Sequence, residues 1–166
     1  MMNAPFGQLF LALQERIAGT VTEIAYVDQD MGQLNGKGRP AVSWPCVLIE
    51  MEDFGYKDMG ELVQTAKGTV LLKLGFAPQG PTGANTPAGY KEAALGHYEL
   101  EWQLNKVLHG WSPAGAAFGT FTRTAVATQR RTDGYRVREM RYSLTFDDRS
   151  LLQETLYVPA TMTVTI

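Results

Sequence analysis

The chain opens with apolar residues at helical spacing. Polar side chains fall between these apolar positions, which lie three or four residues apart: Phe6, Leu9, Phe10, Leu13 and Ile17. Gly19 is a natural terminator because glycine readily adopts the conformation that ends a helix. The pattern therefore predicts an N-terminal helix that ends at about Gly19.

Three strands are predicted in the first half of the chain. Residues 20–27 alternate between two faces, and residues 42–53 form a second extended run in which Pro45 favours a strand entry or an edge. Residues 55–68 mix polar and turn residues, and the apolar run at 69–76 predicts a well-buried third strand. Turn formers dominate residues 28–41 and 77–89, where we expect two flexible loops.

A second, longer helix is predicted from Tyr90 to His109. Its apolar residues form a wide face that we expect to pack on the sheet: Leu95, Tyr98, Trp102, Leu104, Val107 and Leu108. The imidazole of His109 complements the carbonyl end of the helix, and Gly110 can take the left-handed cap. We expect Trp111 to fold back as an apolar anchor that fixes how the chain leaves the helix.

A long hairpin follows the second helix. Residues 118–131 and 135–148 are extended segments joined by Thr132-Asp133-Gly134, and an Asp-Gly pair between such segments signals a hairpin turn. Neither face is cleanly apolar near the turn, so we expect the tip to project into solvent while the end with Tyr142 and Phe146 enters the core. A tail at 156–166 finishes with alternating Met162, Val164 and Ile166.

The order of these elements contains no regular βαβ repeat. It predicts an α+β fold with a mainly antiparallel sheet, two helices packed on one face, and a long projecting hairpin. The 166 residues, 45% hydrophobic and 19% charged, are typical of one folded domain that spans residues 1–166. The net charge of −2 gives no global attraction for nucleic acid.

The sequence favours a reducing compartment and no membrane. Cys46 is the single cysteine, so it cannot form an internal disulfide. No apolar run approaches the length that crosses a bilayer, and the N-terminus lacks the charged start of a signal peptide. We therefore expect an intracellular, soluble chain.

Motifs for catalysis or metal binding are not found in the sequence. The Gly-Lys pair at 36–37 lacks the rest of a phosphate-binding loop, and Asp28 and Asp30 lack the remaining ligands of a calcium loop. His97 and His109 lie twelve residues apart on one predicted helix, about 18 Å along its axis, so they cannot share a metal. We expect a non-enzymatic protein with no cofactor and no metal.

Arginines gather on the predicted hairpin: Arg123, Arg130, Arg131, Arg136, Arg138 and Arg141. Most of the acids lie in the half of the chain up to Glu61. This asymmetry suits head-to-tail contact between identical copies, or a basic edge that faces an acidic or nucleic-acid partner. The alternative is a hairpin that is merely solvated.

The layout resembles the tail-terminator and tail-completion proteins of long-tailed bacteriophages and prophages. The resemblance covers most of the chain and rests on pattern. Its most specific parts are the helix that ends in Val107-Leu108-His109-Gly110-Trp111 and the arginine-containing hairpin that ends in an aromatic strand followed by Asp147. Residues 77–89 and 156–166 fall outside that pattern.

The resemblance implies a homo-oligomeric, hexameric ring that binds no cofactor. Such a ring stops growth of the tail tube, contacts the tube protein, and presents a surface to the head–tail connector. It implies that the six arginines face a neighbouring subunit or a channel through which DNA passes without sequence readout, with Tyr142 and Phe146 packed beneath. It also places the protein in the host bacterial cytoplasm during assembly and then in the virion tail.

Two other functions remain open from the sequence. One is a small-molecule-binding or enzymatic domain with a pocket between the long helix and the sheet, near Trp102, Trp111 and Tyr142. The other is a different phage connector or baseplate component, which would need only interfaces.

Overall fold

The computed structural model describes residues 4–36, 38–114 and 118–152. It contains the helices α1 (Pro5–Thr20) and α2 (Ala88–Leu108), a short 3-10 helix η1 (Ser150–Leu152), and five strands in one sheet: β1 (Tyr26–Gln29), β2 (Cys46–Gly60), β3 (Val63–Phe76), β4 (Thr122–Gln129) and β5 (Arg136–Asp148). The strand order is β1-β2-β3-β5-β4. Only β1 and β2 pair in parallel, which confirms the predicted α+β fold with a mainly antiparallel sheet.

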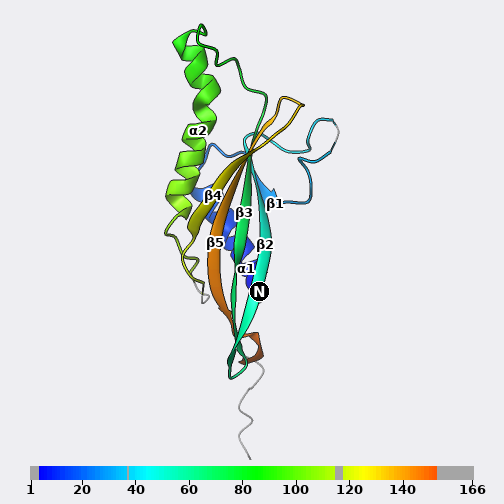
Figure 1. Ribbon diagram of the computed structural model, residues 1–166, viewed down its shortest axis with the longest axis vertical. Coiled ribbons are helices and arrows are strands. Elements are labelled where there is room, and N and C mark those ends of the chain that lie inside the picture. The colour runs from blue at the N-terminus through cyan, green and yellow to red at the C-terminus, as the bar shows by residue number, and fades with distance from the viewer. Residues whose placement is uncertain (1–3, 37, 115–117, 153–166) are drawn as a thin grey trace, which may run out of the picture.

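Both helices cover one face of the sheet. The register aligns Ile49 with Leu72 and Leu72 with Met140, so these side chains share that face. From α1, the residues Leu9, Leu13 and Ile17 pack into the same core at four-residue spacing, and α2 adds Leu100, Leu104 and Leu108. In Figure 1, α1 lies behind the middle of the sheet and α2 extends along its β4 side.

The first predicted strand is wrong over most of its length. Helix α1 continues to Thr20, the N–H of Val21 donates to the carbonyl of Ile17 at 2.9 Å, and the strand begins only at Tyr26. Val21 and Ile24 are both buried, although strict alternation would place them on opposite faces. Their three-residue spacing belongs to a turn, closed by the Ile24 N–H to Val21 carbonyl bond at 3.0 Å.

Residues 55–68 form a second long hairpin, which the sequence pattern does not predict. Strands β2 and β3 pair along their whole length and turn at Glu61 and Leu62, where φ is 51° and 63°. Positive φ at both positions suits a tight hairpin turn, but the usual Asn-Gly signal is missing. Most side chains of this hairpin's outer half are exposed, so its residues look like a polar loop. Its tip lies at the lower end of the molecule in Figure 1.

The buried stripe of α2 differs from the predicted apolar face. Leu104 and Leu108 are buried as expected, but Leu95, Tyr98 and Trp102 are exposed, and Trp102 is 56% exposed. The buried stripe instead contains Ala94, His97 and Leu100, which are three residues apart. Trp102 is therefore not a core anchor. The ammonium of Lys106 lies over its ring, 5.1 Å from the centroid, in a cation–π contact.

The β4–β5 hairpin is built into the sheet rather than free of it. Strand β5 pairs with β3 from Arg136 to Asp148, and β4 pairs with β5 on the other side. At the tip, residues 132–134 are exposed, but the ring of Tyr135 stacks on Trp44 with centroids 4.8 Å apart. The tip is thus held by the loop that precedes β2. The tail at 156–166 lies outside the described residues.

Candidate assembly surfaces

The six arginines of the hairpin do not form one patch. Arg136 and Arg138 lie on the helix face of the sheet, whereas Arg141 occupies the opposite face because strand residues alternate. Arg131 reaches toward the loop before β2 and donates to the carbonyl of Leu34 at 2.7 Å. Arg123 is on the edge strand β4, and Arg130 is in the turn.

Four of these arginines are engaged within the subunit. Arg138 forms an ion pair with Glu101 of α2 at 2.5 Å, and both side chains are largely buried. Arg141 pairs with Glu139 at 3.2 Å and Glu52 at 3.5 Å. The guanidinium of Arg136 lies over the ring of Tyr98, and Arg131 pairs with Asp133. These contacts tie the hairpin to the rest of the subunit.

Arg123 and Arg130 are the two arginines of the six that are classed as exposed. They lie at the β4 side of the sheet, which ends the strand order at the opposite side from β1 and β2. Strand β2 carries the exposed acids Glu50, Asp53 and Asp58, together with the exposed base Lys57. Two exposed arginines therefore lie at the β4 side and three exposed acids lie on β2, although exposed Lys57 on β2 and exposed Glu92 and Glu99 on α2 show that the separation of charge is partial.

The end of α2 is fastened to the start of β4. The φ of Gly110 is 81°, the left-handed conformation expected of a glycine after a helix, and its N–H donates to the Phe121 carbonyl at 2.8 Å. The ring of Trp111 stacks on Phe121 at 5.5 Å. His109 caps the helix, and its Nδ1 accepts a hydrogen bond from the Arg123 N–H at 3.1 Å. His109 thus links the helix end to the edge strand.

Tyr142 and Phe146 belong to β5 itself, and both side chains are buried. The hydroxyl of Tyr142 donates to Asn105 of α2 at 3.2 Å, and burial raises the pKa of this phenol. The ring of Phe146 meets Phe6, Phe54 and Phe118 at centroid distances of 5.6, 5.9 and 5.4 Å. An aromatic cluster thereby joins the start of α1 to β2 and β5.

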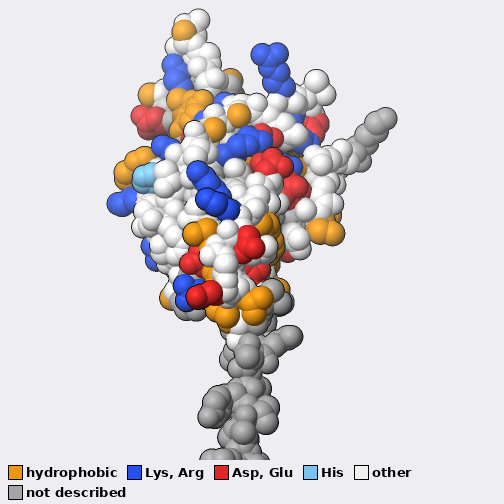
Figure 2. Space-filling model, turned by 60° about the horizontal axis from the view of Figure 1, so that its bottom comes forward, with side chains coloured by type: hydrophobic (Ala, Val, Ile, Leu, Met, Phe, Trp, Pro, Cys, Tyr) orange, Lys and Arg blue, Asp and Glu red, His pale blue; other side chains and the backbone are white. Residues whose placement is uncertain are grey.

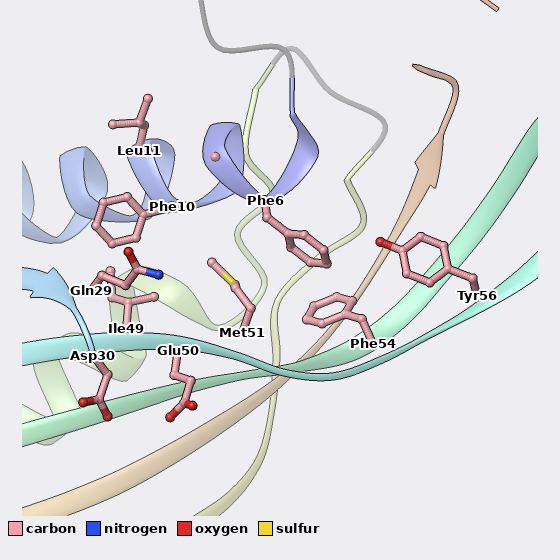
Figure 3. Close-up of a pocket in the computed structure, with 11 residues that line it drawn as sticks. Phe6, Phe10, Leu11, Gln29, Asp30, Ile49, Glu50, Met51, Phe54 and Tyr56 are labelled. Atoms are coloured by element: carbon pink, nitrogen blue, oxygen red, sulfur yellow. The ribbon is translucent and has the colours of Figure 1, made fainter. Parts of the chain in front are cut away.

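An apolar groove runs between α1 and β2, with a volume of about 820 Å³. In Figure 3, Phe6 of α1 faces Met51 and Phe54 of β2 across it. The carboxylates of Asp30 and Glu50 point away from α1 in this view. Leu11 and Tyr56 at its margins are 49% and 46% exposed, so apolar surface stays in contact with solvent.

A bulge in β2 shapes this groove. The pairing of β2 with β3 shifts between Glu52 and Gly55, and φ of Asp53 is 48°. This irregularity turns Phe54 toward α1, where its ring meets Phe6 edge to face at 5.0 Å. On the other side the ring lies against Gly68, where a Cβ would come within 2.4 Å of it.

A second cavity, of about 780 Å³, lies between the first half of α2, residues 79–82 and the β4–β5 turn. Three side chains that line it contain a buried polar atom without a hydrogen-bond partner among the described residues: His97 Nε2, Gln129 Oε1 and Arg136 Nε. His97 Nδ1 lies 3.1 Å from the carbonyl of Ala94. Burial lowers the pKa of His97, and the charge of Arg136 lowers it further.

One thiol and the arrangement of possible metal ligands complete the chemistry of the described residues. The thiol of Cys46 is buried, and this burial raises its pKa to about 11, so it is a poor nucleophile at neutral pH. Within residues 4–36, 38–114 and 118–152, no three His, Cys, Asp or Glu side chains are grouped as metal ligands. Neither described helix combines the length and apolar character needed to cross a membrane.

Two of the three predicted pocket residues, Trp111 and Tyr142, both contact the ring of Phe121, but the three do not form a pocket. Trp102 is exposed, Tyr142 is in the core, and Trp111 packs on Phe121, and none of the three lines either cavity above. The groove was not predicted, because Phe6 and Phe10 read as part of a buried helix face. The only signal was the surplus of apolar residues on α1, where Leu11 and Phe10 extend the stripe beyond the three buried positions.

No protein-family model matches the chain, and no curated protein matches it either. Among solved structures, the fold is similar to that of a chain in a structure described as the virion of a native gene transfer agent particle. The TM-score is 0.53 with 10% sequence identity, and the match covers 89% of this chain and 100% of that chain. At this identity the likeness shows a shared fold.

Proposed function

We propose that this protein is a structural component of a phage-like virion that forms a ring on the end of a tail tube, as a tail terminator does. The fold likeness carries the proposal, because a complete chain of a gene transfer agent virion matches nearly all of this one. Such particles are assembled from many contacting chains, so subunits of this kind need interfaces rather than catalytic groups.

The surfaces of the subunit support assembly by a head-to-tail contact. A ring needs two different complementary surfaces on each copy, since a heterologous contact closes on itself after a fixed number of subunits. Strand β4 and the outer half of β2 are edges of the sheet on opposite sides, with Arg123 and Arg130 near one and Glu50, Asp53 and Asp58 on the other. In this proposal Arg123 and Arg130 contact the neighbour, and the four internally paired arginines hold the hairpin in place.

Tube capping provides the decisive experiment. Tail-tube protein encoded in the same genome would be polymerised with and without this protein, and tube lengths would be measured by electron microscopy. A terminator shortens the length distribution and appears as density at one tube end. Tubes of unchanged length without end density would rule out the terminator role, and binding at another part of a virion would indicate a different connector or baseplate component.

A small-molecule-binding domain is the second candidate, and the cavity next to His97 favours it. Three residues that line one hollow each contain a buried polar atom with no hydrogen-bond partner among the described residues, and a ligand that offers both donors and acceptors could satisfy these atoms if it reached them. This cavity differs from the ligand pocket that the sequence predicted near Trp102. A thermal-shift screen with small carboxylates, phosphates and amides would test it. A ligand that stabilises the wild type but not Arg136→Met would support this function. If the screen finds no such ligand, the function is ruled out for these three ligand classes.

A further inference from the structure

The groove between α1 and β2 is a surface that the described residues leave open. Its walls come from Phe6, Phe10, Met51 and Phe54, and the side chains of Leu11 and Tyr56 at its margins remain about half exposed. Figure 2 shows hydrophobic side chains gathered at the lower end of the coloured part of the molecule. Exposed apolar surface of this kind marks a contact with another chain or segment.

One edge of β2 beside the groove also lacks a strand partner. Strand β1 pairs with β2 only as far as Gln29 and Ile49, and the N–H of Asp30 donates to the Ile49 carbonyl at 2.9 Å. From Glu50 to Gly60, β2 pairs with β3 on its inner side, and no described strand lies on its outer side. An extended segment could add there by main-chain hydrogen bonds while alternate side chains enter the groove.

The sequence of this chain contains a segment suited to that place. Residues 160–166 alternate Ala160, Met162, Val164 and Ile166 with three threonines, which is the pattern of a strand with one apolar face. Pro159 lies just before this run, where a strand tolerates a proline. Residues 153–166 contain one charged side chain, Glu154, so apolar burial and not charge would provide the attraction.

The length of residues 160–166 is compatible with the length of the groove. Seven extended residues span about 23 Å, close to the length of the eight residues of β2, 49–56, that run beside the groove. The described chain ends at η1, which contacts β3 at the same end as the β2–β3 turn. The intervening residues 153–159 span a further 23 Å or so when extended, enough to reach a neighbouring molecule.

We propose that residues 160–166 of one copy dock as a strand in the α1–β2 groove of the next copy. The groove and the segment are different surfaces of the same chain, so each copy offers one and receives the other. A heterologous contact of this kind is what ring closure requires, and the inference rests on the proposed function in that respect. It identifies a second contact between neighbours besides the charged sheet edges.

Disulfide trapping tests the docking directly on the full chain. Cys46 is buried, so a cysteine introduced at the surface would be the reactive one. Leu11→Cys and Val164→Cys would be made as separate variants, mixed, and oxidised mildly. The expected result is a disulfide-linked dimer on a non-reducing gel. As a matched control, Leu95→Cys on α2, which is exposed and outside the groove, should give little dimer with Val164→Cys.

Two outcomes of the trapping experiment would overturn the inference. One is the absence of a dimer above the Leu95→Cys control. The other outcome concerns a double variant that carries both Leu11→Cys and Val164→Cys in one chain. If a disulfide forms only within such single chains, at high dilution, the segment lies in the groove of its own chain.

Substitutions on the two faces of residues 160–166 provide an independent test of strand docking. Val164→Asp puts a carboxylate on the apolar face and should lower trapping between Leu11→Cys and Met162→Cys at least about tenfold, because an unpaired charge resists burial. Thr163→Asp, on the opposite face, should leave trapping unchanged. Equal effects of the two substitutions would contradict strand docking.

The same variants separate this inference from the proposed function. If the wild type forms rings and caps tubes but no trapping occurs, the docking is wrong and the terminator role stands. If trapping occurs but neither rings nor capped tubes are found, the docking stands and the terminator role is wrong.

Discussion

Gly68 and Phe54 show how a single atom can decide local packing. The ring of Phe54 lies so close to Gly68 that an added Cβ would come within 2.4 Å of the ring. Glycine at 68 therefore permits the bulge in β2 to direct Phe54 toward α1 and to form one wall of the groove. No conformational requirement acts here, because φ of Gly68 is not in the left-handed region.

We expect Gly68→Ala to lower the free energy of unfolding by about 1–3 kcal/mol, the usual cost of overpacking a core. Gly96→Ala is a matched control, because Gly96 lies within α2 with no atom within 4 Å of an added Cβ. That change should raise stability by up to about 1 kcal/mol through helix propensity. Urea unfolding would measure both, and equal effects would contradict this account of Gly68.

His97 is the other residue whose surroundings control its chemistry. Its side chain is 4% exposed, between the rings of Phe76 and Tyr98, at centroid distances of 5.7 and 4.1 Å. Burial lowers its pKa, the nearby charges of Arg136 and Arg138 lower it further, and Glu101 and the Ala94 carbonyl oppose them. The neutral ring is therefore the form that the fold accommodates.

This shift predicts a loss of stability in mild acid. Because the folded pKa lies below the unfolded value of about 6.5, the unfolded chain binds more protons between the two values. The stabilisation from neutral His97 is complete above pH of about 6.5 and falls as the pH decreases toward the folded pKa. Urea unfolding at a series of pH values should show a smaller slope in this range for His97→Phe than for the wild type. An unchanged slope would mean that other groups control it.

At the scale of elements, α2 is attached to β5 by polar pairs along its length. Tyr98, Glu101 and Asn105 of α2 meet Arg136, Arg138 and Tyr142 of β5, respectively. Positions three or four apart on a helix share one side, and alternate positions on a strand share one face, so the two series stay in register. These pairs set the position of the long helix along the sheet.

The pair of Glu101 and Arg138 should be strongly coupled. Glu101→Gln removes the charge opposite a largely buried guanidinium, and we expect a cost of about 1.5–3 kcal/mol, typical of a charged hydrogen bond. In a double-mutant cycle with Arg138→Gln, the costs should be less than additive by about 0.5–3 kcal/mol. Arg149→Gln, which breaks the exposed pair with Asp147, should change stability by less than about 0.5 kcal/mol. Additive costs for Glu101 and Arg138 would show that the pair is not coupled.

At the scale of the whole molecule, the strand order places some exposed side chains of opposite charge on opposite sides of one sheet. Arg123 and Arg130 lie beside β4, the last strand in spatial order, and the exposed acids Glu50, Asp53 and Asp58 lie on β2 near the other edge. In a head-to-tail assembly, each positive edge would meet the acidic edge of the next copy.

Charge reversal at one edge should weaken assembly in solution. Six copies of the 18.3 kDa chain would have a mass of about 110 kDa, which light scattering after size exclusion would detect. We expect the double variant Arg123→Glu, Arg130→Glu to shift the mass toward the monomer, and added salt to weaken the wild-type ring through screening. Lys67→Glu, at an exposed residue of a central strand, provides a control for charge reversal away from the two edges. An equal loss of assembly with Lys67→Glu would contradict edge-to-edge pairing.

Local patterns determined much of the fold before any contact was known. The four-residue spacing of Leu9, Leu13 and Ile17 fixed the buried side of α1, and Gly110 marked the end of α2, because both depend on short-range backbone geometry. The Asp133-Gly134 pair located the β4–β5 turn for the same reason. The class of fold followed from the order of these elements.

Tertiary contacts decided which side of each element is buried and which charges are free. Trp102 is exposed and His97 is buried because α2 does not turn its largest apolar side chains toward the sheet. Helix periodicity alone does not decide which of two neighbouring sides of a helix is buried. The β2–β3 hairpin forms through pairing between strands, which its exposed polar residues do not reveal. Likewise, only the register of β5 decided that Arg138 meets Glu101 while Arg141 lies on the opposite face, because alternation assigns successive strand residues to opposite faces.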